Sequence, residues 1–290
     1  MSLHQLYCPE LATGEVGLTR EESHHALAVL RVRVGEDVYL FNGQGTRALA
    51  TVVRTGRRQV YVEVRELYRD AVGTTRTLTL AVAPPRTPRQ GILVEKCVEL
   101  GAAALWPMRC ARGVVQPTDA LSLKWSRRAI EAAKQSERSY VPAVAGPQSF
   151  TEVLSRVSEF AAAAIADESA CSAGPPPFAP GSGPNAQADI MAKNTKTNAV
   201  ASEARSERGQ DSRLPVPLVS FFAGRPVGDP LLILIGPEGG WSDTERHQAQ
   251  EVRLTTVSLG PHVLRIETAA IAVCAAAALL PLGDPPADTD

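Results

Sequence analysis

Residues 231–245 read LLILIGPEGGWSDTE, and this stretch decides the fold class. Its first five residues form a continuous apolar run, which is typical of a parallel strand that is buried on both faces. A turn with three glycines and one proline follows. Ser242 and Glu245 then stand three positions apart, as in a capping box at a helix start. The stretch therefore predicts a buried strand that ends in a glycine-rich turn and leads directly into a helix.

A second stretch of the same kind lies nearby, where residues 259–270 read LGPHVLRIETAA. A short apolar run at 254–260 meets Gly-Pro, and a helix is expected to follow. That helix continues as IAVCAAAALL, which is apolar almost all round, so we expect it to be buried in a core or a subunit interface. Arg265 and Glu267 stand at its entrance, where charged residues commonly form an ion pair or a cap.

The chain between residues 76 and 170 alternates in the same way. Apolar runs at 77–84, 102–108 and 160–167 are separated by helical patterns. In the first of these helices, Leu93, Cys97 and Leu100 share one face and Gly101 supplies a stop; Asp119 is the candidate cap of the second. Alternating strands and helices predict an α/β domain with a parallel sheet.

The N-terminal part is expected to be a small β-structure. Asn42 and Gly43 follow an apolar run and predict a hairpin, and the valines at 60, 62 and 64 alternate with polar residues as in a half-buried strand. Several short strands within about 70 residues suggest a barrel or barrel-like sheet. We therefore expect two domains, at 1–75 and 76–284, with a disordered insertion at 169–217, which is rich in proline, glycine and polar residues.

Composition bounds the partners and the compartment. The net charge is −1, yet residues 76–150 carry 11 basic and five acidic residues, so local positive charge is available for phosphates. No signal pattern or membrane span is evident, which predicts a soluble cytoplasmic protein. The cysteines are odd in number and form no C-x-x-C pair, and the adjacent His24 and His25 are interpreted as structural, so no disulfide framework or metal is expected.

The glycine-rich turn excludes two common nucleotide sites. It has no Lys-Ser/Thr, as a Walker A loop would, and no G-x-G-x-x-G fingerprint, which also disfavours a nucleotide-binding oxidoreductase. Glu238 inside the turn would repel a phosphate. The turn therefore suits a neutral or cationic ligand, and a tight turn without any ligand remains the alternative.

Taken together, LIGPEGGWSDTE and LGPHVLRIETAAIA resemble the RsmE family of S-adenosyl-L-methionine (SAM)-dependent enzymes, which methylate N3 of a uridine in 16S ribosomal RNA and belong to the SPOUT superfamily. The segments HHALAVLRVRVGEDVYLFNG, VEKCVELG and EAAKQSERSYVP are also similar to that family. The resemblance implies an N-terminal PUA-like β-barrel and a C-terminal α/β trefoil-knot domain that forms a homodimer. It also implies 16S rRNA or the small ribosomal subunit as the partner, with no membrane. It places the cofactor against Ile235, Gly236, Pro237, Glu238, Gly239, Gly240, Leu259, Gly260, Val263, Leu264 and Arg265.

The chemistry of uridine methylation suggests roles for two residues at the entrance of the last helix. N3 must lose a proton, and positive charge near O2 or O4 would stabilise the resulting anion. Arg265 is the hypothesis for the positive charge and Glu267 for the base. We expect RNA to bind to the barrel and to a group of basic residues. The candidates are Arg31, Arg33, Arg109, Arg112, Arg127, Lys134 and Arg138. Residues 127, 134 and 138 have the spacing of one helical face.

The sequence also departs from the family pattern. His262 stands where relatives commonly have arginine, Arg86 and Arg89 stand where many have lysine, and the insertion lies between the two knot strands. Two alternatives stay open for this reason. One is another SPOUT enzyme that methylates tRNA or a ribose oxygen, and the other is an RNA-binding protein of the same fold without catalysis.

Overall fold

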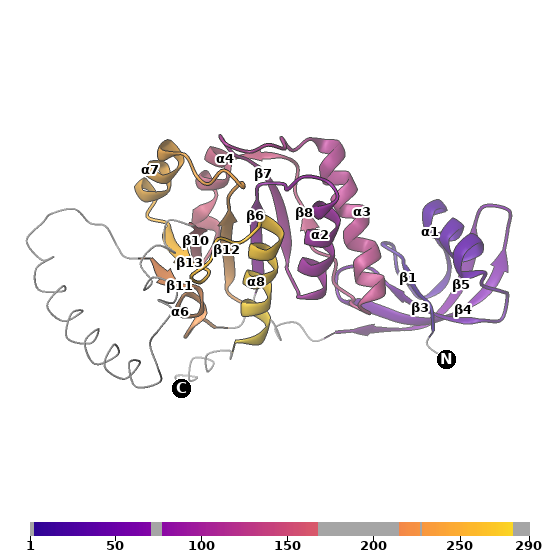
Figure 1. The fold of residues 1–290 in the computed structure, drawn as a ribbon. Helices are drawn as coiled ribbons and strands as arrows, with labels where there is room; N and C mark the ends of the chain where they lie inside the picture. The colour runs from indigo at the N-terminus through magenta and orange to yellow at the C-terminus, as the bar shows by residue number, and fades with distance from the viewer. Residues whose placement is uncertain (1–2, 71–76, 168–214, 227, 281–290) are drawn as a thin grey trace, which may run out of the picture.

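The computed structural model describes residues 3–70, 77–167, 215–226 and 228–280. They form two sheets, one from the N-terminal residues and one, with helices on both faces, from the rest (Figure 1). The expected domain boundary at 75/76 and most of the expected insertion lie outside the described residues. None of the helices in the described ranges is both long and apolar enough to cross a bilayer.

The N-terminal sheet has the order β1-β3-β4-β5-β2, in which β1 runs parallel to β3 and the other pairs are antiparallel. The predicted alternation is confirmed, because Val60, Val62 and Val64 are all buried in the core of this sheet. A short helix and a π-helical turn follow β2. The elements are β1 (Gln5–Tyr7), β2 (Gly14–Gly17), α1 (Arg20–His24), η1 (His25–Leu30), β3 (Asp37–Phe41), β4 (Thr46–Thr55) and β5 (Val60–Arg69).

The predicted hairpin after β3 is confirmed, although its connection is longer than a two-residue turn. β3 ends at Phe41 and β4 begins at Thr46. The side chain of Asn42 accepts hydrogen bonds from the backbone N–H groups of Gln44 and Thr46, at 2.8 and 3.0 Å. Asparagine therefore acts here through its side chain, as a local cap of the turn.

The larger sheet has a parallel core in the order β13-β10-β12-β6-β7. Ile235, the last residue of β12, lies opposite both Val82 of β6 and Ala166 of β10, so these strands end at the same level. The core strands are β6 (Thr77–Val82), β7 (Ala104–Arg109), β10 (Ala162–Ala166), β12 (Pro230–Ile235) and β13 (Thr255–Ser258). Short strands extend both edges: β8 (Ala143–Val144), β9 (Gln148–Ser149) and β11 (Val216–Pro217).

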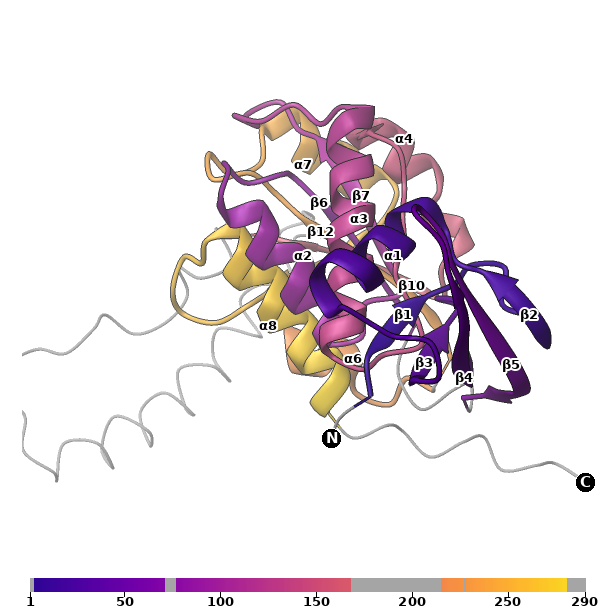
Figure 2. The same cartoon turned by 90° about the vertical axis from the view of Figure 1, so that its right-hand side faces the viewer.

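Two helical layers cover this sheet. Leu231 and Ile233 of β12 pack into the core on one face, whereas Leu232 and Leu234 pack into the core on the other. The continuous apolar run of β12 is thus explained by burial on both sides. The first face carries α2 (Arg89–Glu99), α3 (Asp119–Gln135), α6 (Leu218–Phe222) and α8 (Ile266–Leu279). Figure 2 shows α8, α2 and α3 side by side. The second carries α4 (Phe150–Ser155), η2 (Val157–Glu159) and α7 (Asp243–Glu251).

Three local expectations need correction. The cap of α3 is Thr118, whose side chain accepts a hydrogen bond from the Leu121 N–H, and Asp119 is the first helical residue. The expected insertion ends too late at 217, because Val216 and Pro217 form β11 and pair with β13. The capping box of Ser242 and Glu245 at the start of α7, in contrast, is confirmed.

The two sheets meet at the C-terminal end of α3. Lys134 of α3 lies 3.2 Å from both carboxylate oxygens of Glu22 of α1, and both side chains are almost fully buried. Burial raises the pKa of Glu22, although the positive charge of Lys134 opposes this shift. The Val141 N–H also donates to the Gly43 carbonyl at 2.9 Å, so the N-terminal sheet is tied to the larger sheet by both backbone and charge.

Candidate active site

A pocket opens where β10, β12 and β13 end. It encloses about 600 Å³ of empty space, part of which is open to solvent. Two segments far apart in the sequence form its walls, the turn after β12 and the loop before α8. Its lining consists of Ala166, Asp167, Ile235, Gly236, Pro237, Glu238, Gly240, Trp241, Leu259, His262, Val263, Leu264, Ile266 and Ala269.

The structure brings together most of the residues that were expected at the cofactor. Gly239, Gly260 and Arg265 lie outside the lining, and the other eight line the pocket. Sequence reasoning missed the contributions of Asp167 and Trp241. A carboxylate directly after the buried strand 160–167 was the available signal for Asp167, because ligands bind at the carboxyl ends of parallel strands.

The buried side chain of Trp241 packs against the glycine-rich turn. Its ring is 1% exposed, and its Nε1–H donates to the Ala166 carbonyl at 2.7 Å, which joins the turn after β12 to the end of β10. On its other side the ring packs against Phe150 of α4, with 5.3 Å between ring centroids. A Cβ at Gly236 would lie 2.7 Å from Cε2 of this ring, so a glycine is needed there for the ring to fit.

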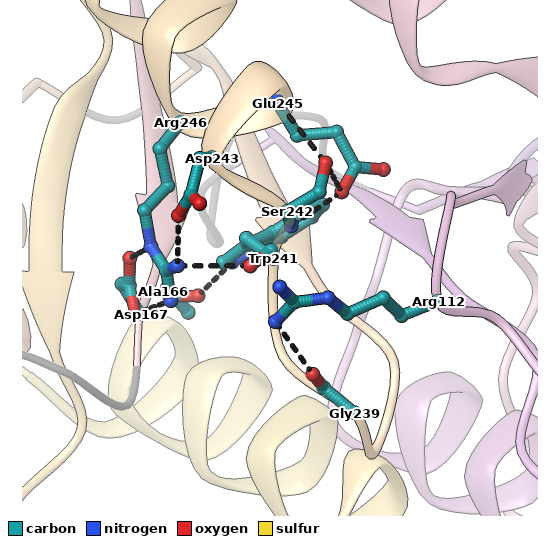
Figure 3. Close-up of polar contacts among 9 residues, drawn as sticks. All are labelled: Arg112, Ala166, Asp167, Gly239, Trp241, Ser242, Asp243, Glu245 and Arg246. Carbon is teal, nitrogen blue, oxygen red and sulfur yellow. Dashed lines mark hydrogen bonds and ion pairs between the residues drawn. The ribbon is translucent and has the colours of Figure 1, made fainter.

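The loop that follows β7 packs over the same turn (Figure 3). The Glu245 carboxylate accepts from the Ser242 N–H at 2.8 Å and, through its other oxygen, from the Ala111 N–H at 2.9 Å. Arg112 donates to the Gly239 carbonyl at 3.3 Å. One carboxylate therefore caps α7 and fixes the position of the loop that carries Arg112.

Asp167 is held by the helix that follows the turn. Arg246 of α7 donates to its carboxylate at 2.8 and 3.3 Å and to the Trp241 carbonyl at 2.9 Å (Figure 3). The bidentate geometry orients the carboxylate at the pocket wall.

Arg89, at the start of α2, connects the two carboxylates at the rim of the pocket. Its Nη1 lies 2.8 Å from Oε1 of Glu238 in the turn, and its Nε lies 3.5 Å from Oε1 of Glu267 in α8. Glu267 is 8% exposed, and its second oxygen, Oε2, is buried without a hydrogen-bond partner among the described residues. Arg265 is exposed at the N-terminal cap position of α8, and its side chain caps no N–H group there.

The RNA candidates are more scattered than expected. Arg31, Arg33, Arg109, Arg112 and Arg127 are exposed. The face proposed for 127, 134 and 138 is wrong for two reasons. Lys134 is buried between Glu22 and Glu131, so its charge is neutralised, and α3 ends at Gln135, so Arg138 lies beyond the helix. Arg138 is half-buried, and desolvation lowers its pKa.

The chemistry of the lining narrows the class of ligand. The charged residues in it are two carboxylates, Asp167 and Glu238, and one histidine, His262, with no lysine or arginine among the described lining residues. Apolar side chains form much of the remaining wall. Because Arg246 and Arg89 pair with the two carboxylates, the lining offers carboxylate oxygens and apolar surface, which suit a small organic molecule with hydrogen-bond donors better than a polyphosphate. In the described ranges, no group of three or more histidine, cysteine or acidic side chains is placed to hold a metal ion.

Comparisons with known proteins agree with this geometry. The model of an RNA methyltransferase domain matches residues 74–180 and 182–278, and that of an RNA methyltransferase PUA domain matches 18–65. The chain is 28% identical to the ribosomal RNA small subunit methyltransferase E of Bacillus subtilis, over 87% of this chain and 85% of that one. A relative of the same name from Mycobacterium bovis is 27% identical, over 92% and 88% of the two chains.

Solved structures have the same fold. A ribosomal RNA small subunit methyltransferase E from Neisseria gonorrhoeae, determined with bound S-adenosyl methionine, superposes with a TM-score of 0.69 at 25% identity, over 95% of this chain and 96% of that one. A methyltransferase from Legionella pneumophila superposes with a TM-score of 0.71 at 23% identity, over 94% and 96% of the chains. With a domain match over most of its length and these relatives, the chain belongs to the RsmE family of RNA methyltransferases.

Proposed function

We propose that this protein transfers the methyl group of SAM to N3 of a uridine in 16S ribosomal RNA. The observation that carries the proposal is the pocket at the ends of β10, β12 and β13, which is built from the two loops at 236–241 and 259–265. The family membership supplies the reaction class, RNA methylation, and the pocket supplies the place for the methyl donor.

The residues of the pocket fit SAM. Ile235, Leu259 and Leu264 offer apolar surface to an adenine ring, and the main chain of the two loops offers polar groups at close range. Glu238 and Asp167, each paired with an arginine, offer carboxylate oxygens that can accept hydrogen bonds from the ammonium group of SAM. When bound, SAM supplies an electrophilic methyl group on a positively charged sulfur.

Glu267 and Arg265 are the proposed catalytic residues. Oε2 of Glu267 is buried and has no hydrogen-bond partner among the described residues, and a rotation of the carboxylate toward the pocket would let it accept a hydrogen bond from uridine N3–H and then the proton. The carboxylate lies in the first turn of α8, next to Ile266, which lines the pocket. Arg265 projects from the adjacent cap position and is free to place positive charge at uridine O2 or O4.

RNA binding is assigned to the N-terminal domain, 1–75, and to the exposed arginines around the pocket. Arg109 is the last residue of β7, and Arg112 lies in the loop that follows it over the glycine-rich turn, at the same edge of the parallel sheet as the methyl donor site. They are therefore placed to contact phosphates next to the target base.

The finer architecture is part of the proposal. The pairing of β4 with β5 shifts register at Leu49/Ala50 and at Val52/Arg54, and such shifts accompany the bending of strands, which supports a PUA-like barrel. The position of β10 between β12 and β13, with the donor loops side by side, supports a trefoil knot in the domain 76–284. The proposal includes a homodimer formed through this domain, in which Leu279 of α8, 79% exposed, would be covered. We place the protein in the cytoplasm, where ribosomal RNA is modified.

The test is a methylation assay with the purified chain and isotope-labelled SAM, using both naked 16S rRNA and assembled small subunits. Mass spectrometry of the digested nucleosides should find labelled N3-methyluridine. A labelled ribose or a methylated tRNA would contradict the substrate assignment. Calorimetry with SAM in the absence of RNA separates an enzyme from an RNA-binding protein of the same fold, since the latter would give no heat of binding.

A further inference from the structure

A second concave site lies on the N-terminal domain, away from the donor pocket. Its lining consists of four cationic or polar side chains and two apolar ones: Arg20, His24, Leu27, Ala28, Arg57 and Arg58. Arg20 and His24 are the first and last residues of α1, and Arg57 and Arg58 lie in the turn between β4 and β5. Two elements thus converge on one hollow, and no acidic residue lines it.

The arginines of this hollow have no ion-pair partner within the described part of the chain. Arg20, Arg57 and Arg58 are exposed, and they make no ion pair or side-chain hydrogen bond with other described residues. Arg54 of the same hairpin behaves differently, because it pairs with Glu15 at 2.9 Å and stacks on a tyrosine ring. Three like charges placed together without a counter-charge repel one another, so the arrangement costs stability unless an anion binds.

The geometry of the hollow is fixed by buried contacts behind it. The Val60 N–H, at the start of β5, donates to the Ser23 hydroxyl at 3.0 Å, and that hydroxyl donates to the Leu18 carbonyl at 3.2 Å. The Leu18 N–H donates to the Val60 carbonyl at 2.9 Å. Helix α1 and the β4–β5 turn are therefore held together next to the arginines, which reduces the ordering cost of binding a ligand between them.

We propose that this hollow, defined by Arg20, His24, Arg57 and Arg58, is a binding site for the phosphodiester backbone of the substrate RNA. Guanidinium groups bind phosphate oxygens in a bidentate manner, and His24 adds an imidazole donor. The apolar Leu27 and Ala28 give the floor a surface that a ribose can contact. The inference rests on the proposed function, and it adds that the RNA contacts both the N-terminal part and the part that holds the donor pocket.

The site has a consequence for the substrate. The hollow belongs to the N-terminal sheet and the donor pocket to the ends of β10 and β12, so a short oligonucleotide around the target base reaches the pocket alone. A longer folded RNA contacts both. The hollow therefore contributes to affinity for the folded RNA and leaves the chemical step unchanged.

The test compares the double variant Arg57→Gln, Arg58→Gln with a control double variant, Lys96→Gln, Arg156→Gln. The control removes the same charge from side chains that are paired with Glu99 and Glu159. Fluorescence anisotropy with a folded 16S rRNA fragment should give a Kd about tenfold higher for the test variant. The slope of log K against log salt concentration should be shallower by roughly 1.4 to 1.8, because two phosphate contacts are lost. The control should match the wild type, and KM should rise for the fragment while kcat stays the same.

The following outcomes test the proposed RNA-binding site. If the test variant and the control weaken RNA binding equally, the effect is one of net charge and the proposal is overturned. If KM for a short target oligonucleotide rises as much as KM for the fragment, the hollow acts through the donor pocket and the proposal is also overturned. Arg20→Gln, which approaches from α1, should reproduce the loss, so misfolding of the hairpin variant cannot mimic the result. Failure of methylation with all RNAs, together with intact hollow-dependent RNA binding, would refute the proposed function and leave this site standing.

Discussion

Replacing Gly236 by alanine should damage the donor pocket through one identifiable contact. The added Cβ would lie 2.7, 3.0 and 3.1 Å from Cε2, Cζ2 and Cδ2 of Trp241. The ring cannot retreat easily, because it is 1% exposed, bonded to the Ala166 carbonyl and packed on Phe150. The backbone of Gly236 lies outside the left-handed region, so steric overlap is the cause and conformational strain is not.

The magnitude follows from overpacking. Inserting a methyl group into a filled site costs about 1–3 kcal/mol. If the turn keeps its position, this cost lowers the free energy of unfolding. If the turn shifts to relieve the overlap, the cost returns when SAM requires the original geometry, and Kd rises by about 5- to 150-fold. The quantity to measure is therefore the loss of unfolding free energy plus the loss of binding free energy for SAM.

The assays are urea unfolding and calorimetry with SAM, and Gly91→Ala is the matched control. Gly91 lies within α2, and a Cβ there meets nothing closer than 3.8 Å, so alanine should stabilise the helix by about 0.5–1 kcal/mol. Trp241→Phe in the Gly236→Ala background should cost less than it does alone, because the larger ring is the source of the overlap. Gly236→Ala with unchanged unfolding and unchanged SAM affinity would refute the reasoning.

Three further predictions concern charged groups. Glu22→Gln removes the buried partner of Lys134 and should lower the free energy of unfolding by about 1–3 kcal/mol, since Lys134 keeps only Glu131; urea titrations check this. Arg89→Lys cannot reach Glu238 and Glu267 together, so kcat/KM for methylation should fall by roughly tenfold with little change in unfolding, and wild-type kinetics would exclude a positioning role. Arg265→Ala should lower kcat by roughly 100-fold while SAM affinity measured by calorimetry stays constant, and an unchanged methylation rate would remove this residue from the mechanism.

Local signals in the sequence predicted the elements around the site well. Ser242 and Glu245 are three residues apart, and their capping box depends on that spacing alone. The buried run of β12 and the glycine after it were equally readable, because their physical cause lies within a few residues. The residues expected at the cofactor, in contrast, were named from the family resemblance, and eight of the eleven line the pocket.

Contacts between distant residues could not be read in this way. The bond from Trp241 to Ala166 joins residues 75 positions apart, and the bridge from Arg89 to Glu238 joins residues 149 positions apart. Lys134 was expected at an RNA surface, and only the placement of Glu22 shows that it is buried. The four side chains of the basic hollow come from a helix and a turn whose proximity depends on the Ser23 hydroxyl.

The place of β10 in the larger sheet also governs the order in which the chain can fold during synthesis. β10 pairs with β12 and β13, both of which follow it in the sequence, so it has no neighbour in this sheet when it first leaves the ribosome. The N-terminal sheet, by contrast, takes all its strands from the first 69 residues and can fold early. The N-terminal sheet, to which we assign RNA binding, can therefore fold well before the pocket at the ends of β10, β12 and β13 is complete.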